Sequence, residues 1–152
     1  MKFLLISLVV VLGFVVFGLL FLAYQSKSLT PTLGVLDGEL TACSKPSNCV
    51  NSMASSEIAP IDFQSSSESA WQQMQEALMR HGGTIEQKNE VYLWATFRTP
   101  LLGFVDDVEI LMVAESQHFH IRSASRVGRS DFSANRNRVE LIRLSFSENT
   151  HQ

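Results

Sequence analysis

An uncharged apolar run near the amino terminus constrains this chain more than any other feature. Residues 3–24, FLLISLVVVLGFVVFGLLFLAY, form a run of 22 residues without a charge. As a helix at about 1.5 Å per residue the run is about 33 Å long, enough to cross a hydrocarbon core about 30 Å thick. The sequence therefore predicts a transmembrane anchor over 1–24, a linker over 25–60 and a folded domain over 61–152.

Two processing signals are alternatives to a retained anchor. A secretory signal peptide has a shorter apolar core, about 7–15 residues, followed by a small-x-small cleavage site, and LAYQ at 22–25 fits such a site poorly. LTAC at 40–43 reads like a lipoprotein signal, but a polar stretch separates its cysteine from the apolar run. We therefore expect an uncleaved anchor.

The flanking charges and the cysteines indicate a location. Lys2 precedes the span and Lys27 is the only nearby charge after it, so the positive-inside tendency places the domain outside the cytoplasm. Cys43 and Cys49 are the only cysteines, and in an oxidising compartment we expect them to form a disulfide that contributes about 2 kcal/mol. The expected location is a bacterial inner membrane, with the domain in the periplasm.

The alternative to a disulfide is half of a zinc site. Two thiolates lack the remaining two ligands of tetrahedral zinc, and no CxxC or HxxxH pattern supplies them. We therefore predict no metal and no cofactor.

The net charge of −3 is unevenly distributed. Residues 122–143 carry six arginines against Asp131 and Glu140, a net charge of +4, so the rest of the chain carries −7. A nucleic-acid-binding protein is usually basic over a broad face, so we expect no nucleic-acid partner. A small anion fits this block better, and near a bilayer the natural candidate is an anionic lipid head group.

The soluble part has the pattern of a small α+β domain. The serines at 65–67 and Glu68 predict a helix start, and Gly82-Gly83 predicts its end. A last helix is expected from about Ser133, with an apolar stripe that includes Phe132 and also, unexpectedly, Asn135. Strand-like segments lie at 84–90, 91–99, 105–115 and 118–125, the last two joined as a hairpin around 116–117. We expect an antiparallel sheet of three to four strands with two flanking helices on one face.

Four blocks of the chain resemble domain-of-unknown-function family 1499: CSKPSNCVNS, AWQQM, YLWATFRTPLLGFVDDVEIL and IRSASRVGRSDFSANRNRVELIR. The resemblance covers roughly residues 40–145 and implies an α+β domain that is membrane-associated or exported, in bacteria or plant chloroplasts. It implies no reaction. The positions that look like the family signature are Cys43, Asn48, Cys49, Asp106, Asp107, Arg122, Ser123, Ser125, Arg126, Gly128, Arg129, Asp131 and Asn135.

The block SASRVGRSDFSANRNR at 123–138 is the best candidate for a site. Its glycine lies between two arginines just before a helix start, where free N–H groups and the helix dipole favour anions. Guanidinium groups add planar forks that suit phosphate, sulfate or carboxylate. The candidate ligand-binding residues are Arg122, Ser123, Ser125, Arg126, Gly128, Arg129 and Asn135.

The same block also has a purely structural interpretation. If the strands at 105–115 and 118–125 pair, acids of the first lie opposite Arg122 and Arg126 of the second, as ion pairs worth about 0–1 kcal/mol each if exposed. Asn135 would then hydrogen-bond a sheet edge. The acids expected in structural roles are Asp106, Asp107, Glu109 and, as a helix cap, Asp131.

The sequence favours a binding or scaffolding module over an enzyme. A serine/histidine hydrolase is one alternative, but no G-x-S-x-G is present, and His118 and His120 share one face of a strand, where we expect them to face solvent. The neighbours Asp106 and Asp107 should point to opposite faces, so they cannot easily share a proton or a metal. The other alternative is a structural subunit of a membrane complex, with Leu141 as part of its contact patch.

Overall fold

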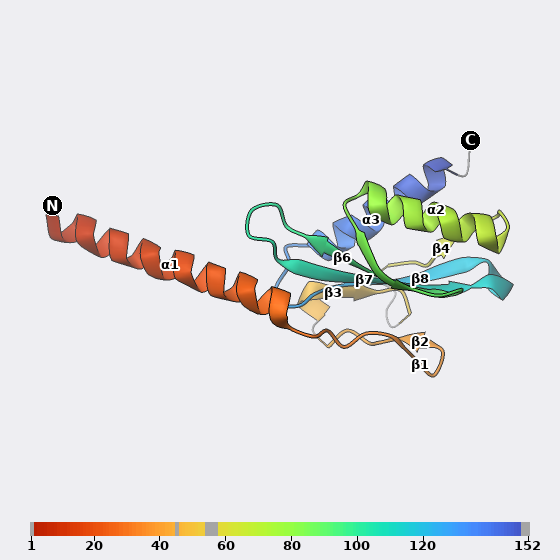
Figure 1. The fold of residues 1–152 in the computed structure, drawn as a ribbon, viewed down its shortest axis with the longest axis horizontal. Coiled ribbons are helices and arrows are strands. Elements are labelled where there is room, and N and C mark those ends of the chain that lie inside the picture. Colours follow the sequence, from red (N-terminus) through yellow and green to blue (C-terminus); the bar gives the residue numbers. More distant parts are fainter. Residues whose placement is uncertain (1, 45, 54–57, 150–152) are drawn as a thin grey trace.

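The apolar run forms a long helix, α1 (Lys2–Ser28), that projects from one end of a folded domain (Figure 1). The computed structural model describes residues 2–44, 46–53 and 58–149, so positions 45, 54–57 and 150–152 of the expected linker and domain lie outside the described residues. Within the described part of the chain, α1 is the one helix long and apolar enough to cross a membrane, and Ala23 is the one buried residue of its apolar run 3–24.

The helix α1 continues past Tyr24, where the apolar run ends. Ser26 is fully buried, and its hydroxyl accepts a hydrogen bond from the N–H of Val105 (2.8 Å) and donates one to the carbonyl of Val105 (3.3 Å). The last turn of α1 is therefore part of the folded domain. This contact with the sheet explains why the polar residues 25–28 remain helical.

The main sheet is antiparallel and has six strands, so the expectation of three to four was wrong. Its path is β3-β8-β7-β6-β5, and β4 pairs with the same edge of β8 as β3. The bounds are β3 (Cys49–Asn51), β4 (Ile61–Asp62), β5 (Thr84–Lys88), β6 (Tyr92–Arg98), β7 (Val105–Val113) and β8 (His118–Ser125). Of the strands that the sequence missed in this sheet, β3 lies in the expected linker and β4 comes directly after it, and both are only two or three residues long, too short for a periodic pattern.

Two α-helices pack on one face of this sheet (Figure 1). Ser66 caps α2 (Ser67–Arg80) by accepting from the N–H of Ser69, as the serine run predicts. The chain then turns at Gly83, where a Cβ atom would lie 2.8 Å from the carbonyl oxygen of Leu78. The last helix is α3 (Ala134–Asn149). The α+β class is therefore confirmed.

The apolar core lies between these helices and the sheet. Phe119 of β8 is at its centre and contacts the rings of Phe63 and Phe146 at centroid distances of 4.9 and 5.6 Å. The fully buried Met74 and Ile142 bring α2 and α3 into the same cluster. Burial of these side chains against the sheet is the main force that holds the two layers together.

The other face of the sheet is also covered, contrary to the expectation of a single covered face. The hairpin of β1 (Val35–Leu36) and β2 (Glu39–Leu40) lies across it (Figure 1). Leu40 of this hairpin packs with Tyr92 and Leu111 in a second, smaller cluster. Short 3-10 helices, η1 (Pro46–Asn48) and η2 (Ala114–Ser116), precede β3 and join β7 to β8.

Phe132 was wrongly expected in the buried stripe of the last helix. It lies before α3, its side chain is 93 % exposed, and its backbone has φ +51°. The helix starts later because Asp131 accepts hydrogen bonds from the N–H groups of Ser133 and Asn135, which fixes the first turn beyond Phe132.

Candidate functional site

The polar residues of β7 and β8 separate onto the two faces of the sheet. Neighbouring residues of a strand point to opposite faces, so Asp107 and Arg122 face the β1–β2 hairpin while Asp106 and Ser123 face α3. We call the first group the linker-side cluster (Asp107, Glu109, Arg122 and Arg126). The second is the helix-side cluster (Asp106, Ser123, Ser125, Asn135 and Arg138).

Glu109 and Arg122 form the innermost pair of the linker-side cluster. They lie opposite each other in the β7–β8 register, and the Nη1 of Arg122 is 2.7 Å from the Oε2 of Glu109. Glu109 is fully buried, and its Oε1 accepts from the N–H of Gly34 (2.7 Å) and from the hydroxyl of Tyr92 (2.8 Å). Burial, together with the charge of Glu109, raises the pKa of Tyr92 far above its usual range. The cluster thus holds the hairpin segment at Gly34 against the sheet.

Asp107 and Arg126 form the second pair of the linker-side cluster, and this pair reaches α1. Two parallel hydrogen bonds of 2.8 Å join the guanidinium to the carboxylate, and Asp107 also accepts from the indole N–H of Trp94 (2.9 Å). The hydrogen bonds to Asp107 raise the pKa of Arg126 above its ordinary value. The Nη1 of Arg126 donates to the carbonyl oxygens of Ser26 (3.5 Å) and Leu29 (3.2 Å). A cation at the carboxyl end of a helix is favourable, so Arg126 fixes the end of α1 to the sheet.

The helix-side cluster joins α3 to the sheet. Asn135 is fully buried; its amide nitrogen donates to the carbonyl of Asn48 (2.9 Å) and to Ser125 (3.0 Å), and its amide oxygen accepts from Ser123 (2.6 Å). Arg138 binds Asp106 at 2.6 Å. Asn135, the polar residue in the apolar stripe of α3, therefore satisfies the last backbone carbonyl of η1 and the serine hydroxyls of β8.

The loop between β8 and α3 carries the remaining predicted residues. The carbonyl of Gly128 accepts from the side chain of Asn48 (2.9 Å), and Ser47 donates to the carbonyl of Arg129. The side chain of Arg129 is exposed. Because Asp131 already occupies the N–H groups of Ser133 and Asn135, the start of α3 does not present these donors to an external anion.

A cleft of about 220 Å³ lies beside the linker-side cluster. Its walls come from the segment that follows α1 and from β7 and β8: Leu29, Thr30, Pro31, Thr32, Ser44, Asp107, Arg122, Ala124, Ser125 and Arg126. The side chain of Arg122 is 9 % exposed, and its buried Nε has no hydrogen-bond partner among the described residues. The cleft thus gathers Arg122, Ser125 and Arg126 of the predicted ligand-binding set.

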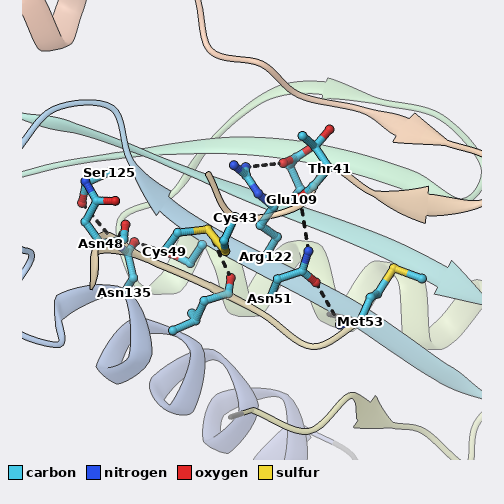
Figure 2. The surroundings of a disulfide bond; sticks show 12 residues. Thr41, Cys43, Asn48, Cys49, Asn51, Met53, Glu109, Arg122, Ser125 and Asn135 are labelled. Carbon is cyan, nitrogen blue, oxygen red and sulfur yellow. Dashed lines mark hydrogen bonds and ion pairs between the residues drawn. A yellow bond between two sulfur atoms is a disulfide. The ribbon is translucent and has the colours of Figure 1, made fainter. Parts of the chain in front are cut away.

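The disulfide between Cys43 and Cys49 is present, as the sequence predicts. It joins the segment after β2 to the start of β3, and Figure 2 shows it near the Glu109–Arg122 pair. In the same region Asn51 donates to the carbonyl of Thr41 (3.2 Å). The cysteines therefore attach the covering segment to the edge of the main sheet, and a disulfide-bonded Cys43 has no thiol for a lipid.

The two histidines of β8 do not face solvent freely, contrary to the expectation. The Nε2 of His120 lies 3.0 Å from the Nε2 of His118, and the Nδ1 of His120 lies 3.1 Å from the hydroxyl of Ser52. Burial is the main cause that lowers the pKa of His120, and the charge of His118 lowers this pKa further. The Ser52 hydroxyl also accepts from the backbone N–H of Ile121 (2.9 Å), so it is engaged in linking β8 to the residue after β3.

The sequence did not single out several residues that complete these clusters. Arg138 reaches Asp106 from α3, and Tyr92 and Trp94 reach the buried acids from β6. Tyr92 and Trp94 are two positions apart in β6 and so lie on one face of the sheet, which is the signal that the sequence offers for them. No local pattern pairs Arg138 with Asp106, because that contact depends on how α3 crosses the sheet.

The fold and its clusters define a small α+β domain carried on an amino-terminal apolar helix. Residues 39–146 match the model of the family described as protein of unknown function (DUF1499). The match covers more than half of the chain, and the chain belongs to this family, as its four sequence blocks indicated. No curated protein matches the chain significantly.

Proposed function

We propose that this protein is a single-span, membrane-anchored binding module that accepts a small anionic group, an anionic lipid head group, in the cleft beside the end of α1. The location we propose is a bacterial inner membrane, with the domain on the periplasmic side. The proposal concerns binding and scaffolding and includes no reaction. One observation carries the binding site: the buried guanidinium N–H at the Nε of Arg122 has no partner among the described residues, and Arg122 lines a cleft next to α1.

The contacts of the last turn of α1 support a retained anchor. Ser26 is fully buried against Val105, and Ala23 is only 3 % exposed. Cleavage after LAY (22–24) would remove the buried Ala23 and leave Ser26 and Leu29, whose carbonyls Arg126 binds, next to a new amino terminus without the helix before them. The disulfide supports an oxidising compartment, and Lys2 supports a cytoplasmic amino terminus.

The donors of the cleft favour a singly charged group. The linker-side cluster is electrically balanced, since Glu109 and Asp107 each bind one arginine. A phosphodiester would bring an acceptor for the Nε of Arg122, which finds none in the described part of the chain, and a buried unpaired donor costs about 1–3 kcal/mol. A volume near 220 Å³ is below the usual range for drug-sized ligands, which suits a phosphate group with its glycerol.

Filling the cleft without changing its charge tests this proposal. Ala124 lines the cleft, so Ala124→Leu should occupy the space of the head group. Titration of the full chain in uncharged detergent with soluble dihexanoyl phosphatidylglycerol should give a saturable fluorescence change, because Trp94 donates to Asp107 in the cleft wall. We expect Ala124→Leu to abolish this change.

Matched controls separate occupancy from side effects. Ala114→Leu adds the same side chain at an exposed position and should bind as the unmodified chain does. Dihexanoyl phosphatidylcholine and inorganic phosphate distinguish a lipid head group from any lipid and from free phosphate. Equal binding by the Ala124→Leu and Ala114→Leu variants would exclude the cleft as the site.

A further inference from the structure

Two loops leave the sheet at the same end. Arg98, the last residue of β6, pairs with Val105, the first of β7, and Asp106 pairs with Ser125, the last of β8. The β6–β7 connection at 99–104 and the β8–α3 connection at 126–133 therefore emerge side by side. Figure 1 shows both at the end of the domain from which α1 projects.

These loops present the two most exposed large apolar side chains of the described domain. Leu101 is 91 % exposed and Phe132 is 93 % exposed. Full exposure of a leucine and of a phenylalanine is unfavourable in water. An apolar tip of this kind marks a surface that contacts something apolar.

Both side chains are held outward by ordered backbone. In the first loop the N–H of Thr99 donates to the carbonyl of Phe104, and the N–H of Gly103 donates to the carbonyl of Thr99, both at 3.0 Å. In the second, Phe132 has the left-handed φ of +51°, and its N–H donates to the hydroxyl of Ser130. A side chain kept exposed at a strained backbone position suggests a functional role.

The end of α1 lies against the same loops. A Cβ atom on Gly103 would lie 3.1 Å from the Cε of Lys27, and Arg126 binds the carbonyl of Leu29. Tyr24, one turn before the end of α1, is 67 % exposed, and tyrosine is enriched where a spanning helix meets the membrane surface. A bilayer crossed by α1 would therefore have its surface at the level of both loops.

The exposed charges around the two tips match such a surface. Lys27, Arg98 and Arg129 are exposed and basic, and Asp131 in the second loop is engaged in capping α3. Apolar side chains surrounded by basic ones are typical of a protein face that lies on anionic lipid. A protein partner would need a continuous apolar area, whereas these are two separate tips.

We infer that Leu101 and Phe132 insert into the bilayer that α1 crosses, as a second attachment that fixes the orientation of the domain on the membrane. This inference rests on the proposed function of α1 as an anchor. It goes beyond that function by assigning the lipid surface as the partner of the two loop tips. With the domain held in this way, the cleft beside α1 lies next to the head groups.

Site-specific labels test the inference on the full chain in liposomes that contain phosphatidylglycerol. The variants Leu101→Cys and Phe132→Cys, labelled with an environment-sensitive fluorophore after the native disulfide has formed, should show blue-shifted emission and strong quenching by doxyl lipids. Leu36→Cys is the matched control: Leu36 is 74 % exposed and lies in β1, at the opposite end of the domain (Figure 1). Its label should be quenched by aqueous iodide and several-fold less by doxyl lipids.

Flotation of the same liposomes distinguishes the possible failures. Labels at 101 and 132 that respond to iodide as the label at 36 does, on protein that floats with the liposomes, would overturn the insertion and leave the anchor intact. Protein that does not float with the liposomes would overturn the anchor and the insertion with it. Quenching by doxyl lipids at positions 101 and 132, without comparable quenching at position 36, supports the inference.

Discussion

At the scale of single residues, Glu109 shows how a buried charge is kept in this fold. Its two oxygens receive donors from Arg122, Tyr92 and the backbone of Gly34, so the carboxylate replaces water with fixed hydrogen bonds. Removing one partner of a buried ion pair strongly destabilises the fold, because the remaining charge has no solvent to stabilise it. The exposed pair of Arg143 and Glu140 in α3 has no such constraint.

The buried pair predicts a large effect for a small chemical change. Glu109→Gln keeps the shape of the side chain but leaves Arg122 without its counter-charge, so we expect a loss of about 3 kcal/mol in the free energy of unfolding. Urea titration of the full chain in detergent measures it. Glu140→Gln, at the exposed pair, should change the free energy by less than about 1 kcal/mol. Similar losses for the two variants would contradict the buried pair.

At the scale of elements, the sequence predicted what depends on local patterns. The start of α2 follows from its serine cap, and the pairing of β7 with β8 follows from two alternating segments around a turn. The strands β1–β4 were missed because they are two or three residues long and exist through their partners, which for β3 is the edge of β8. Phe132 was misplaced because an apolar residue at helical spacing can also lie in the turn between a capping residue, here Asp131, and the first residue of the helix.

The candidate site likewise has parts that local sequence patterns predict and parts that depend on tertiary contacts. The arginines and acids of β7 and β8 were found from charge and spacing, and strand alternation placed Asp106 and Asp107 on opposite faces. That alternation also separates Arg122 from Ser123, which the sequence grouped as one site. In α3, Asn135 was found from its place in the apolar stripe, but the contacts of α1 and of Arg138 come from tertiary packing, which no local pattern encodes.

The disulfide predicts how the covering segment is held to the sheet. Cys43 and Cys49 are six positions apart, and Cys49 starts the strand that pairs with β8 at Ala124. Closing so small a loop restricts the unfolded chain, so we expect Cys43→Ser combined with Cys49→Ser to lower the free energy of unfolding by about 2 kcal/mol. Urea titration with and without reductant checks this. Reductant should lower the free energy of unfolding of the unmodified chain to that of the double variant and leave the variant unchanged. A double variant as stable as the oxidised chain would refute a stabilising role for the disulfide.

At the scale of the whole molecule, the positive block and the apolar helix are parts of one arrangement. Most of the charge that stands out in the sequence is compensated, since Arg122, Arg126 and Arg138 each bind a buried or nearly buried acid. The arginines of this block connect elements of the fold. Arg126 binds backbone carbonyls at the end of α1, and Arg138 of α3 binds Asp106 of β7. The helix α1 is therefore joined to the domain through hydrogen bonds of Arg126 and Ser26 rather than through a free linker.

That arrangement predicts that the helix stays on the mature protein. Because Ala23 and Ser26 are buried in the domain, we expect the chain purified from membranes to keep α1 by intact-mass spectrometry and to remain in the pellet after alkaline carbonate. The combined change Leu22→Ala and Tyr24→Ala creates the Ala-x-Ala pattern that signal peptidase prefers, and it supplies a cleaved comparison. If the unmodified chain were released at the same mass as this variant, α1 would be a signal peptide, and the hydrogen bonds of Arg126 to residues 26 and 29 would not hold an anchor in the mature protein.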